Sequence, residues 1–124
     1  MVLNCGAYFP SNTNWPPLIK DLYSTYLRPH EHSEQASLSK KMITADFPYC
    51  FLVSANEDFL LPSTLEFQEV LKERGIPHQF LLYSNPKHPI YHDFQLDYST
   101  QDGSKCLKDE THFLASFPNK TQEN

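Results

Sequence analysis

The chain has 124 residues, a length that suits one domain and is short for two. Its 40% apolar and 14% aromatic content is enough for a hydrophobic core, which argues against disorder over most of the chain. The net charge of −5 argues against a nucleic-acid-binding surface, because such a surface needs clustered Lys and Arg.

The sequence also indicates a cellular compartment. No stretch free of charge and proline is long enough to cross a bilayer, and the first residues lack the basic start and apolar run of a signal peptide. The three cysteines, Cys5, Cys50 and Cys106, are an odd number without close spacing. Such cysteines fit reduced thiols better than a disulfide framework or a zinc site. We therefore expect a cytoplasmic protein without a membrane segment.

Glycine is scarce in this chain, which has ten prolines but only three glycines (Gly6, Gly75 and Gly103). Phosphate cradles and nucleophile turns need glycine, because it allows a close backbone approach or a strained turn. The three isolated glycines exclude a GxGxxG loop, a P-loop and a GxSxG elbow. Any active site of this protein therefore does not rest on a glycine-built loop within this chain.

The first third of the chain predicts a strand, a loop and a helix. The apolar run 2–5 is interpreted as a buried strand that Gly6 ends. Apolar residues then recur at helical spacing over 18–27, after two prolines and before Pro29. The following polar stretch contains a short predicted helical turn near 38–42.

The clearest region begins at Phe47. Residues 49–53 are apolar on both faces, which is typical of a central strand in a parallel sheet. Ser63 and Glu66 have the spacing of a capping box, which predicts a helix that begins at Ser63. Gly75 is placed as the left-handed residue after that helix.

The remaining elements are a strand over 79–83, a loop over 85–91 and a terminal helix over 104–117. The order strand, helix, strand, loop, helix predicts an α/β fold with parallel strands, whose carboxyl ends meet at one edge. Asp58 and His92 both follow predicted strand ends, so we expect them to lie at this edge.

Asp58 and His92 are the strongest catalytic candidates. A carboxylate next to an imidazole accepts from Nδ1–H, fixes the tautomer and stabilises the imidazolium. The order acid, then histidine is the order in which α/β-hydrolases carry these residues. The alternative is structural, in which Asp58 caps the next helix and His92 is a polar surface residue.

From Phe47 to Phe117 the chain resembles the C-terminal part of the α/β-hydrolase fold, esterase/lipase type. The resemblance rests on FPYCFLVSANEDFL (47–60), LEFQEVLKERGIPHQFLLY (65–83) and HDFQL (92–96). It implies that Asp58, in a D-x-L turn, is the triad acid, and that His92, in an H-G-F-like turn, is the triad base. Asp93 replaces the common glycine of that turn. The resemblance implies neither a metal nor an organic cofactor.

The resemblance also implies how the chain is organised. Residues 1–124 would be the C-terminal portion of one α/β-hydrolase domain with about three parallel strands. The segment VLNCGAY looks like the strand that follows the nucleophile helix, residues 10–46 would be a cap-like insertion, and residues 47–117 would hold the last strands and helices.

The sequence lacks both the G-x-S-x-G elbow and an H-G-G-type oxyanion loop. We therefore interpret it as a truncated product, a split half or a piece of an esterase about twice this length. It would supply the triad acid and base, would act on a small ester once completed, and would be inactive alone. The alternative is a non-catalytic binding or oligomerisation module that pairs through an exposed sheet edge.

Other residues offer weaker candidates. His88 is a second candidate for the triad base, but no phenylalanine follows it at the required position. Pro89 disfavours a helix that would place His88 and His92 on one metal ion. His30-Glu31-His32 could bind a surface metal, and Glu57 could replace Asp58 as the acid.

Overall fold

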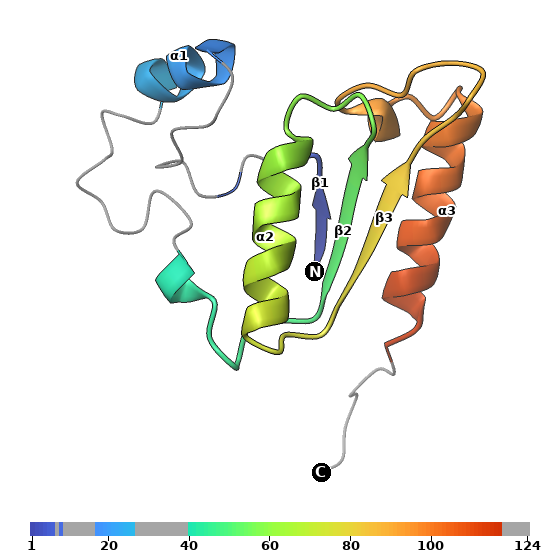
Figure 1. The fold of residues 1–124 in the computed structure, drawn as a ribbon. Coiled ribbons are helices and arrows are strands. Elements are labelled where there is room, and N and C mark those ends of the chain that lie inside the picture. The colour runs from blue at the N-terminus through green and yellow to red at the C-terminus, as the bar shows by residue number, and fades with distance from the viewer. Residues whose placement is uncertain (7, 9–16, 27–39, 118–124) are drawn as a thin grey trace.

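The computed structural model describes residues 1–6, 8, 17–26 and 40–117. Its strands are β1 (Val2–Asn4), β2 (Cys50–Ala55) and β3 (His78–Tyr83). Its helices are α1 (Pro17–Tyr26), α2 (Leu61–Glu73) and α3 (Gln101–Ala115), with short 3-10 turns η2 (Lys40–Met42) and η3 (Phe94–Leu96). The predicted α/β class is confirmed (Figure 1).

The three strands form one parallel sheet in the order β1-β2-β3. All six residues of β2 are buried, as predicted for a central strand. β1 is only partly buried, so the prediction of a buried strand there is wrong. The reason is its position, because β1 pairs with β2 on one side and is an edge strand of the described sheet.

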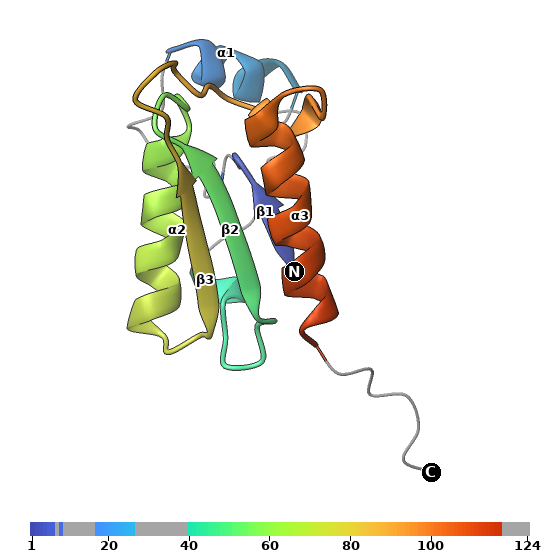
Figure 2. The same ribbon diagram turned by 90° about the vertical axis from the view of Figure 1, so that its right-hand side faces the viewer.

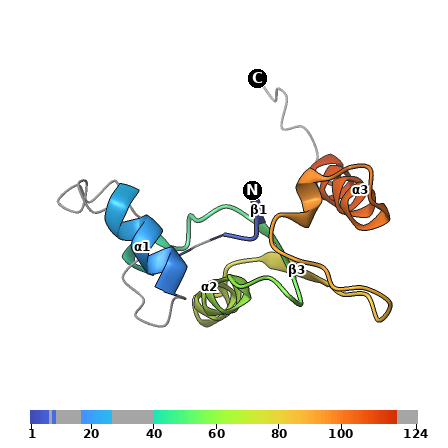
Figure 3. The ribbon, with the colours of Figure 1, turned by 90° about the horizontal axis from the view of Figure 1, so that it is seen from above.

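The central strand contributes to two cores. Helices α2 and α3 cover opposite faces of the sheet (Figure 3). Cys50 and Leu52 of β2 pack with Phe67 of α2, whereas Phe51 and Val53 pack on the α3 side. This alternation explains why the sequence of β2 is apolar without interruption.

The two long helices begin earlier than the sequence predicts. α2 begins at Leu61 rather than Ser63, and its N-cap residue Leu60 makes no side-chain capping bond. The predicted capping box is wrong, because the Ser63 hydroxyl accepts a tertiary hydrogen bond from the Tyr8 N–H at 2.8 Å. α3 begins at Gln101 because the Thr100 hydroxyl caps its first turn.

Two glycines have clear structural tasks. Gly75 follows α2 with φ +65, the left-handed conformation that the sequence predicts. Gly103 lies in the first turn of α3, where a Cβ atom would lie 2.1 Å from the carbonyl oxygen of Asp97. Only glycine therefore lets the end of η3 pack against this turn of α3. Both glycines therefore shape the fold.

Candidate functional site

The carboxyl ends of β1, β2 and β3 lie at one end of the sheet (Figures 1 and 2). The segment after β2 carries Asp58, and the longer segment after β3 carries His92. In open α/β sheets this edge is where ligands bind. Asp58 and His92 therefore lie where the sequence places them.

A backbone bridge joins the two segments immediately before the two side chains. Glu57 and Tyr91 form an isolated parallel β-bridge, in which the Glu57 N–H donates to the Ile90 carbonyl at 3.2 Å. Asp58 and His92 are the next residues along each segment. The bridge continues the parallel pairing of β2 and β3 past their ends and so fixes the distance between the two side chains.

Asp58 is held by three donors. Its Oδ1 accepts from the Leu60 N–H at 2.9 Å and faces His92 Nδ1 at 2.8 Å, and its Oδ2 accepts from the Ser54 hydroxyl at 2.7 Å. The carboxylate side chain is 0% exposed. A buried carboxylate costs free energy unless hydrogen bonds compensate it, and both oxygens here are satisfied. The bond from the Leu60 N–H organises the turn that precedes α2, but it is no side-chain cap of that helix, so the helix-capping alternative for Asp58 is wrong.

His92 is half-buried between an aromatic ring and a second carboxylate. The Phe59 ring lies 4.5 Å from the imidazole centroid, and Nε2 lies 3.3 Å from Asp93 Oδ2. Since an ionised carboxylate only accepts hydrogen bonds, Nδ1 carries the proton that faces Asp58. Nε2 is then the nitrogen whose lone pair is available to act as a base when His92 is neutral.

Asp93 follows His92 in the H-G-F-like turn, at the position where glycine is common in the family that the sequence resembles. Its φ of 59 and ψ of 23 lie in the left-handed region, which glycine adopts freely and which Asp tolerates better than most residues. The departure from H-G-F therefore preserves the backbone conformation. It also adds a carboxylate beside Nε2 of His92.

Two further residues of the site come from strand ends and were not identified from the sequence. Ser54 is the last but one residue of β2, and Cys5 directly follows β1, with its N–H donating to the Val53 carbonyl at 2.9 Å. The sulfur of Cys5 contacts Gln95 Oε1 at 3.6 Å. Ser54 and Cys5 each stand at the end of an apolar run that forms a strand of the same sheet. A polar or sulfur-bearing residue at such a strand end is the sequence signal that could have identified them.

The thiol of Cys5 has the character of an unreactive buried group. Burial raises its pKa from 9.0 to about 12, and the Asp58 carboxylate acts in the same direction. A thiol with so high a pKa is protonated at neutral pH and is a poor nucleophile. The raised pKa of this thiol argues against Cys5 as the missing nucleophile.

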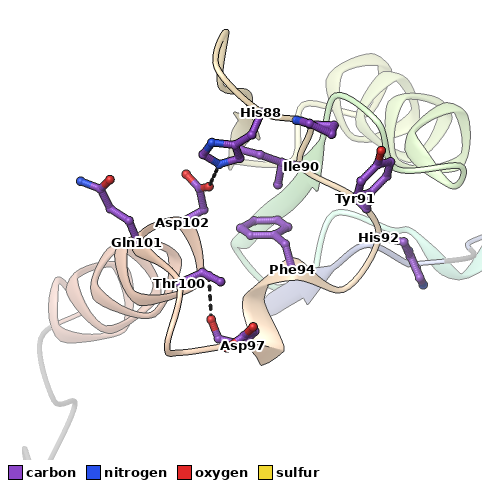
Figure 4. A pocket seen from close by; sticks show the side chains of 10 residues that line it. His88, Ile90, Tyr91, His92, Phe94, Asp97, Thr100, Gln101 and Asp102 are labelled. Atoms are coloured by element: carbon purple, nitrogen blue, oxygen red, sulfur yellow. Dashed lines mark hydrogen bonds and ion pairs between the residues drawn. The ribbon is translucent and has the colours of Figure 1, made fainter.

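His88, the second candidate base, lies in a different place. Its Nε2 pairs with Asp102 Oδ2 at 2.7 Å on the wall of a pocket of about 390 Å³. The apolar part of that wall includes Ile90 and Phe94. In Figure 4 the His92 side chain points away from the His88–Asp102 pair. The structure brings His92, and not His88, to Asp58.

The other predicted candidates contribute less. Glu57 is exposed, in agreement with a solvent-facing side chain. His30-Glu31-His32 and most of the cap-like insertion 10–46 lie outside the described residues. Helix α1, within that insertion, lies to the side of α2 and beyond the carboxyl ends of the strands (Figures 1 and 3).

Comparisons with known proteins bear on the fold. No family model matches the sequence, and no curated protein matches it. Among solved structures, the chain is similar to the crystal structure of esterase B from Lactobacillus Rhamnosis (HN001), with a TM-score of 0.74 and 17% identity. The similar region covers 92% of this chain and 39% of that esterase.

The chain has part of an α/β-hydrolase-like fold. It spans well under half the length of the esterase that it resembles. In the part of the chain that the structure describes, no helix combines the length and apolar character that a bilayer crossing requires.

Proposed function

We propose that this chain supplies the acid and the base of a carboxylic-ester hydrolase, and that sequence outside the chain supplies the serine. The observation that carries the proposal is the 2.8 Å contact between Asp58 Oδ1 and His92 Nδ1 at the carboxyl edge of the sheet. The likeness to an esterase over 92% of the chain supports the same reaction class.

The pair would perform general acid–base catalysis. His92 Nε2 takes the proton of the serine hydroxyl as the serine attacks the ester carbonyl, and it returns that proton to the leaving alcohol. A water molecule then cleaves the acyl-enzyme by the same route. Asp58 keeps the imidazole in the required tautomer and stabilises its charged form. The Asp93 side chain, which is 47% exposed and lies 3.3 Å from Nε2, would have to rotate away for the serine to approach.

On this proposal, the segment that supplies the serine would attach at the free edge of β1. Within the described residues β1 pairs with β2 alone, so its outer edge offers unpaired backbone groups. A preceding strand that pairs there would bring a nucleophile next to the loops that carry Asp58 and His92. On this proposal the isolated chain hydrolyses no ester above background.

The test uses the coding sequence upstream of Met1. We expect a G-x-S-x-G motif there, and we expect the extended chain to hydrolyse p-nitrophenyl acetate. Asp58→Asn and His92→Ala should each lower kcat by about 10³- to 10⁴-fold. His88→Gln is the matched control and should leave kcat unchanged. An upstream stop codon without the motif, or activity that survives His92→Ala, would overturn the proposal.

A second candidate function is a non-catalytic module that pairs through a sheet edge. One observation favours it: Leu81 and Leu82 of the outer strand β3 are 36% and 47% exposed. Two copies of the chain could then associate through β3. Sedimentation equilibrium distinguishes the two functions, because a dimer that Leu82→Lys dissociates supports the module and a monomer rejects it.

A further inference from the structure

Three different metal-ligating side chains meet at the proposed catalytic pair, where Cys5 joins Asp58 and His92. The sulfur of Cys5, a carboxylate oxygen of Asp58 and a ring nitrogen of His92 all lie within 4.8 Å of one another. No other group of three His, Cys, Asp or Glu side chains comes this close within residues 1–6, 8, 17–26 and 40–117.

The sheet edge explains why these three atoms converge. Cys5 follows β1, Asp58 follows β2, and His92 lies on the segment after β3. Hydrogen bonds from the Cys5 N–H to Val53 and from the Glu57 N–H to Ile90 hold the three segments side by side. The ligand atoms therefore sit on a backbone that is fixed before any ion binds.

The donor set suits a borderline-soft divalent ion. Sulfur, imidazole nitrogen and carboxylate oxygen are the ligands of Zn²⁺, whereas Mg²⁺ and Ca²⁺ prefer oxygen alone. Zinc bonds of about 2.0 to 2.3 Å place tetrahedral ligand atoms roughly 3.5 Å apart. The 2.8 Å contact between Asp58 and His92 therefore has to open slightly, and any separation near the 4.8 Å limit has to close by about 1 Å. Cys5 and Asp58 are buried, whereas His92 is half-buried.

We propose that Cys5, Asp58 and His92 form an inhibitory Zn²⁺ site, in which the ion replaces the hydrogen bond between His92 and Asp58. Cys5 binds as a thiolate, and its proton leaves to solvent. The thiolate, the Asp58 carboxylate and a neutral imidazole then balance the two positive charges of the ion. This neutrality suits a buried position, where an uncompensated charge is costly.

The inhibitory effect rests on the proposed function and follows from the chemistry of the imidazole. If Nδ1 binds the ion, the ring proton moves to Nε2, and if Nε2 binds it, the lone pair of Nε2 is used. In both cases Nε2 no longer accepts the proton of a serine hydroxyl. Metal binding and ester hydrolysis therefore exclude each other.

Binding is tested on the full 124-residue chain without a polyhistidine tag, with Co²⁺ as a spectroscopic probe and Zn²⁺ as its competitor. We expect one equivalent of Co²⁺ to produce a thiolate charge-transfer band that Zn²⁺ removes. Cys5→Ser should abolish that band, and His92→Gln should weaken Co²⁺ binding by about tenfold or more. Thermal melts confirm that each variant is folded.

Matched controls come from the same chain. Cys106→Ser removes another buried thiol, and His88→Gln removes another Asp-paired imidazole, so both variants should bind Co²⁺ like the wild type. A missing thiolate band in the wild type overturns the proposal. So does a band that survives Cys5→Ser, or undiminished Co²⁺ binding by His92→Gln, which remains decisive if Cys5→Ser fails to fold.

The failure of this site and the failure of the proposed function give different results. Co²⁺ binding by the chain alone, together with an upstream-extended chain that hydrolyses no ester, supports the metal site and rejects the catalytic role. Ester hydrolysis by the extended chain that Zn²⁺ does not inhibit overturns the inhibitory site and leaves the catalytic role intact.

Discussion

The hydroxyl of Ser54 donates to the oxygen of Asp58 that His92 does not contact. The Ser54 Oγ to Asp58 Oδ2 distance is 2.7 Å, and both residues are buried. Because the Leu60 N–H and His92 occupy Oδ1, the carboxylate has no free direction in which to rotate. Ser54 is thus a positioning residue for the proposed acid.

The first prediction concerns this hydroxyl. Ser54→Ala leaves one oxygen of a buried carboxylate without its donor, so we expect the free energy of unfolding to fall by about 2 to 3 kcal/mol. Ser63→Ala is the matched control, because the Ser63 hydroxyl is also buried but bonds a neutral backbone N–H. Ser63→Ala should lower the free energy of unfolding by about 1 kcal/mol. Urea denaturation measures both values, and equal losses would contradict the role assigned to Ser54.

The second prediction compares two His–Asp pairs. Asp58→Asn removes the acceptor of a buried pair, so we expect unfolding free energy to fall by about 2 to 4 kcal/mol and the His92 proton to move from Nδ1 to Nε2. Asp102→Asn breaks the pair with His88, whose side chain is 51% exposed. Asp102→Asn should lower the free energy of unfolding by only about 0 to 1 kcal/mol.

Two measurements check this comparison. Urea denaturation gives the free energies, and nitrogen-15 NMR of the imidazole identifies the tautomer. A His92 ring that keeps its proton on Nδ1 in Asp58→Asn would show that Asp58 does not set the tautomer.

The sequence predicts the parts of the fold that depend on local pattern. The uninterrupted apolar run of β2, the left-handed Gly75 and the positions of Asp58 and His92 after strand ends are all readable from neighbouring residues. Parallel pairing follows from the order of elements, because the helix between β2 and β3 forms a crossover. These features place the candidate pair at one edge without any coordinates.

The parts that the sequence does not predict depend on contacts between distant segments. Ser63 is used by Tyr8, which lies 55 positions earlier, and not by its own helix. Cys5 approaches Asp58 only because β1 pairs with β2 in the register that joins Asn4 to Val53. Pair register and tertiary hydrogen bonds are set by the whole packing arrangement, so a local pattern carries no record of them.

The third prediction tests the core on the α3 side of the sheet. Phe113 is 3% exposed and packs on Phe51 and Tyr49, whereas Phe117, two positions past the end of α3, is 41% exposed and also contacts Tyr49. Phe113→Ala should lower the free energy of unfolding by about 3 to 5 kcal/mol. Phe117→Ala should lower the free energy of unfolding by about 1 kcal/mol, since 41% of the residue is already exposed to water in the folded state. Equal effects in thermal or urea unfolding would refute this assignment of the core.

The fourth prediction concerns stability at alkaline pH. Burial, and after it the Glu110 carboxylate, raises the pKa of the Cys106 thiol from 9.0 to about 12. Above pH 9 the unfolded chain loses this proton while the folded chain keeps it, so the unfolded state binds fewer protons and unfolding becomes easier as the pH rises. The stabilisation is complete below pH 9 and is lost progressively toward pH 12, by at most about 1.4 kcal/mol per pH unit for this group.

Cys106→Ala removes this titration and is therefore expected to flatten the decline of stability above pH 9, even though the smaller side chain costs about 1 kcal/mol at neutral pH. Burial also raises the pKa of Cys5 and Cys50, so part of the decline remains in the variant. Leu107→Ala, at the next and 44% exposed position of α3, is the control and should keep the wild-type slope. Urea denaturation at several values between pH 7 and 11 measures the slopes, and an unchanged slope in Cys106→Ala would show that this thiol ionises equally in both states.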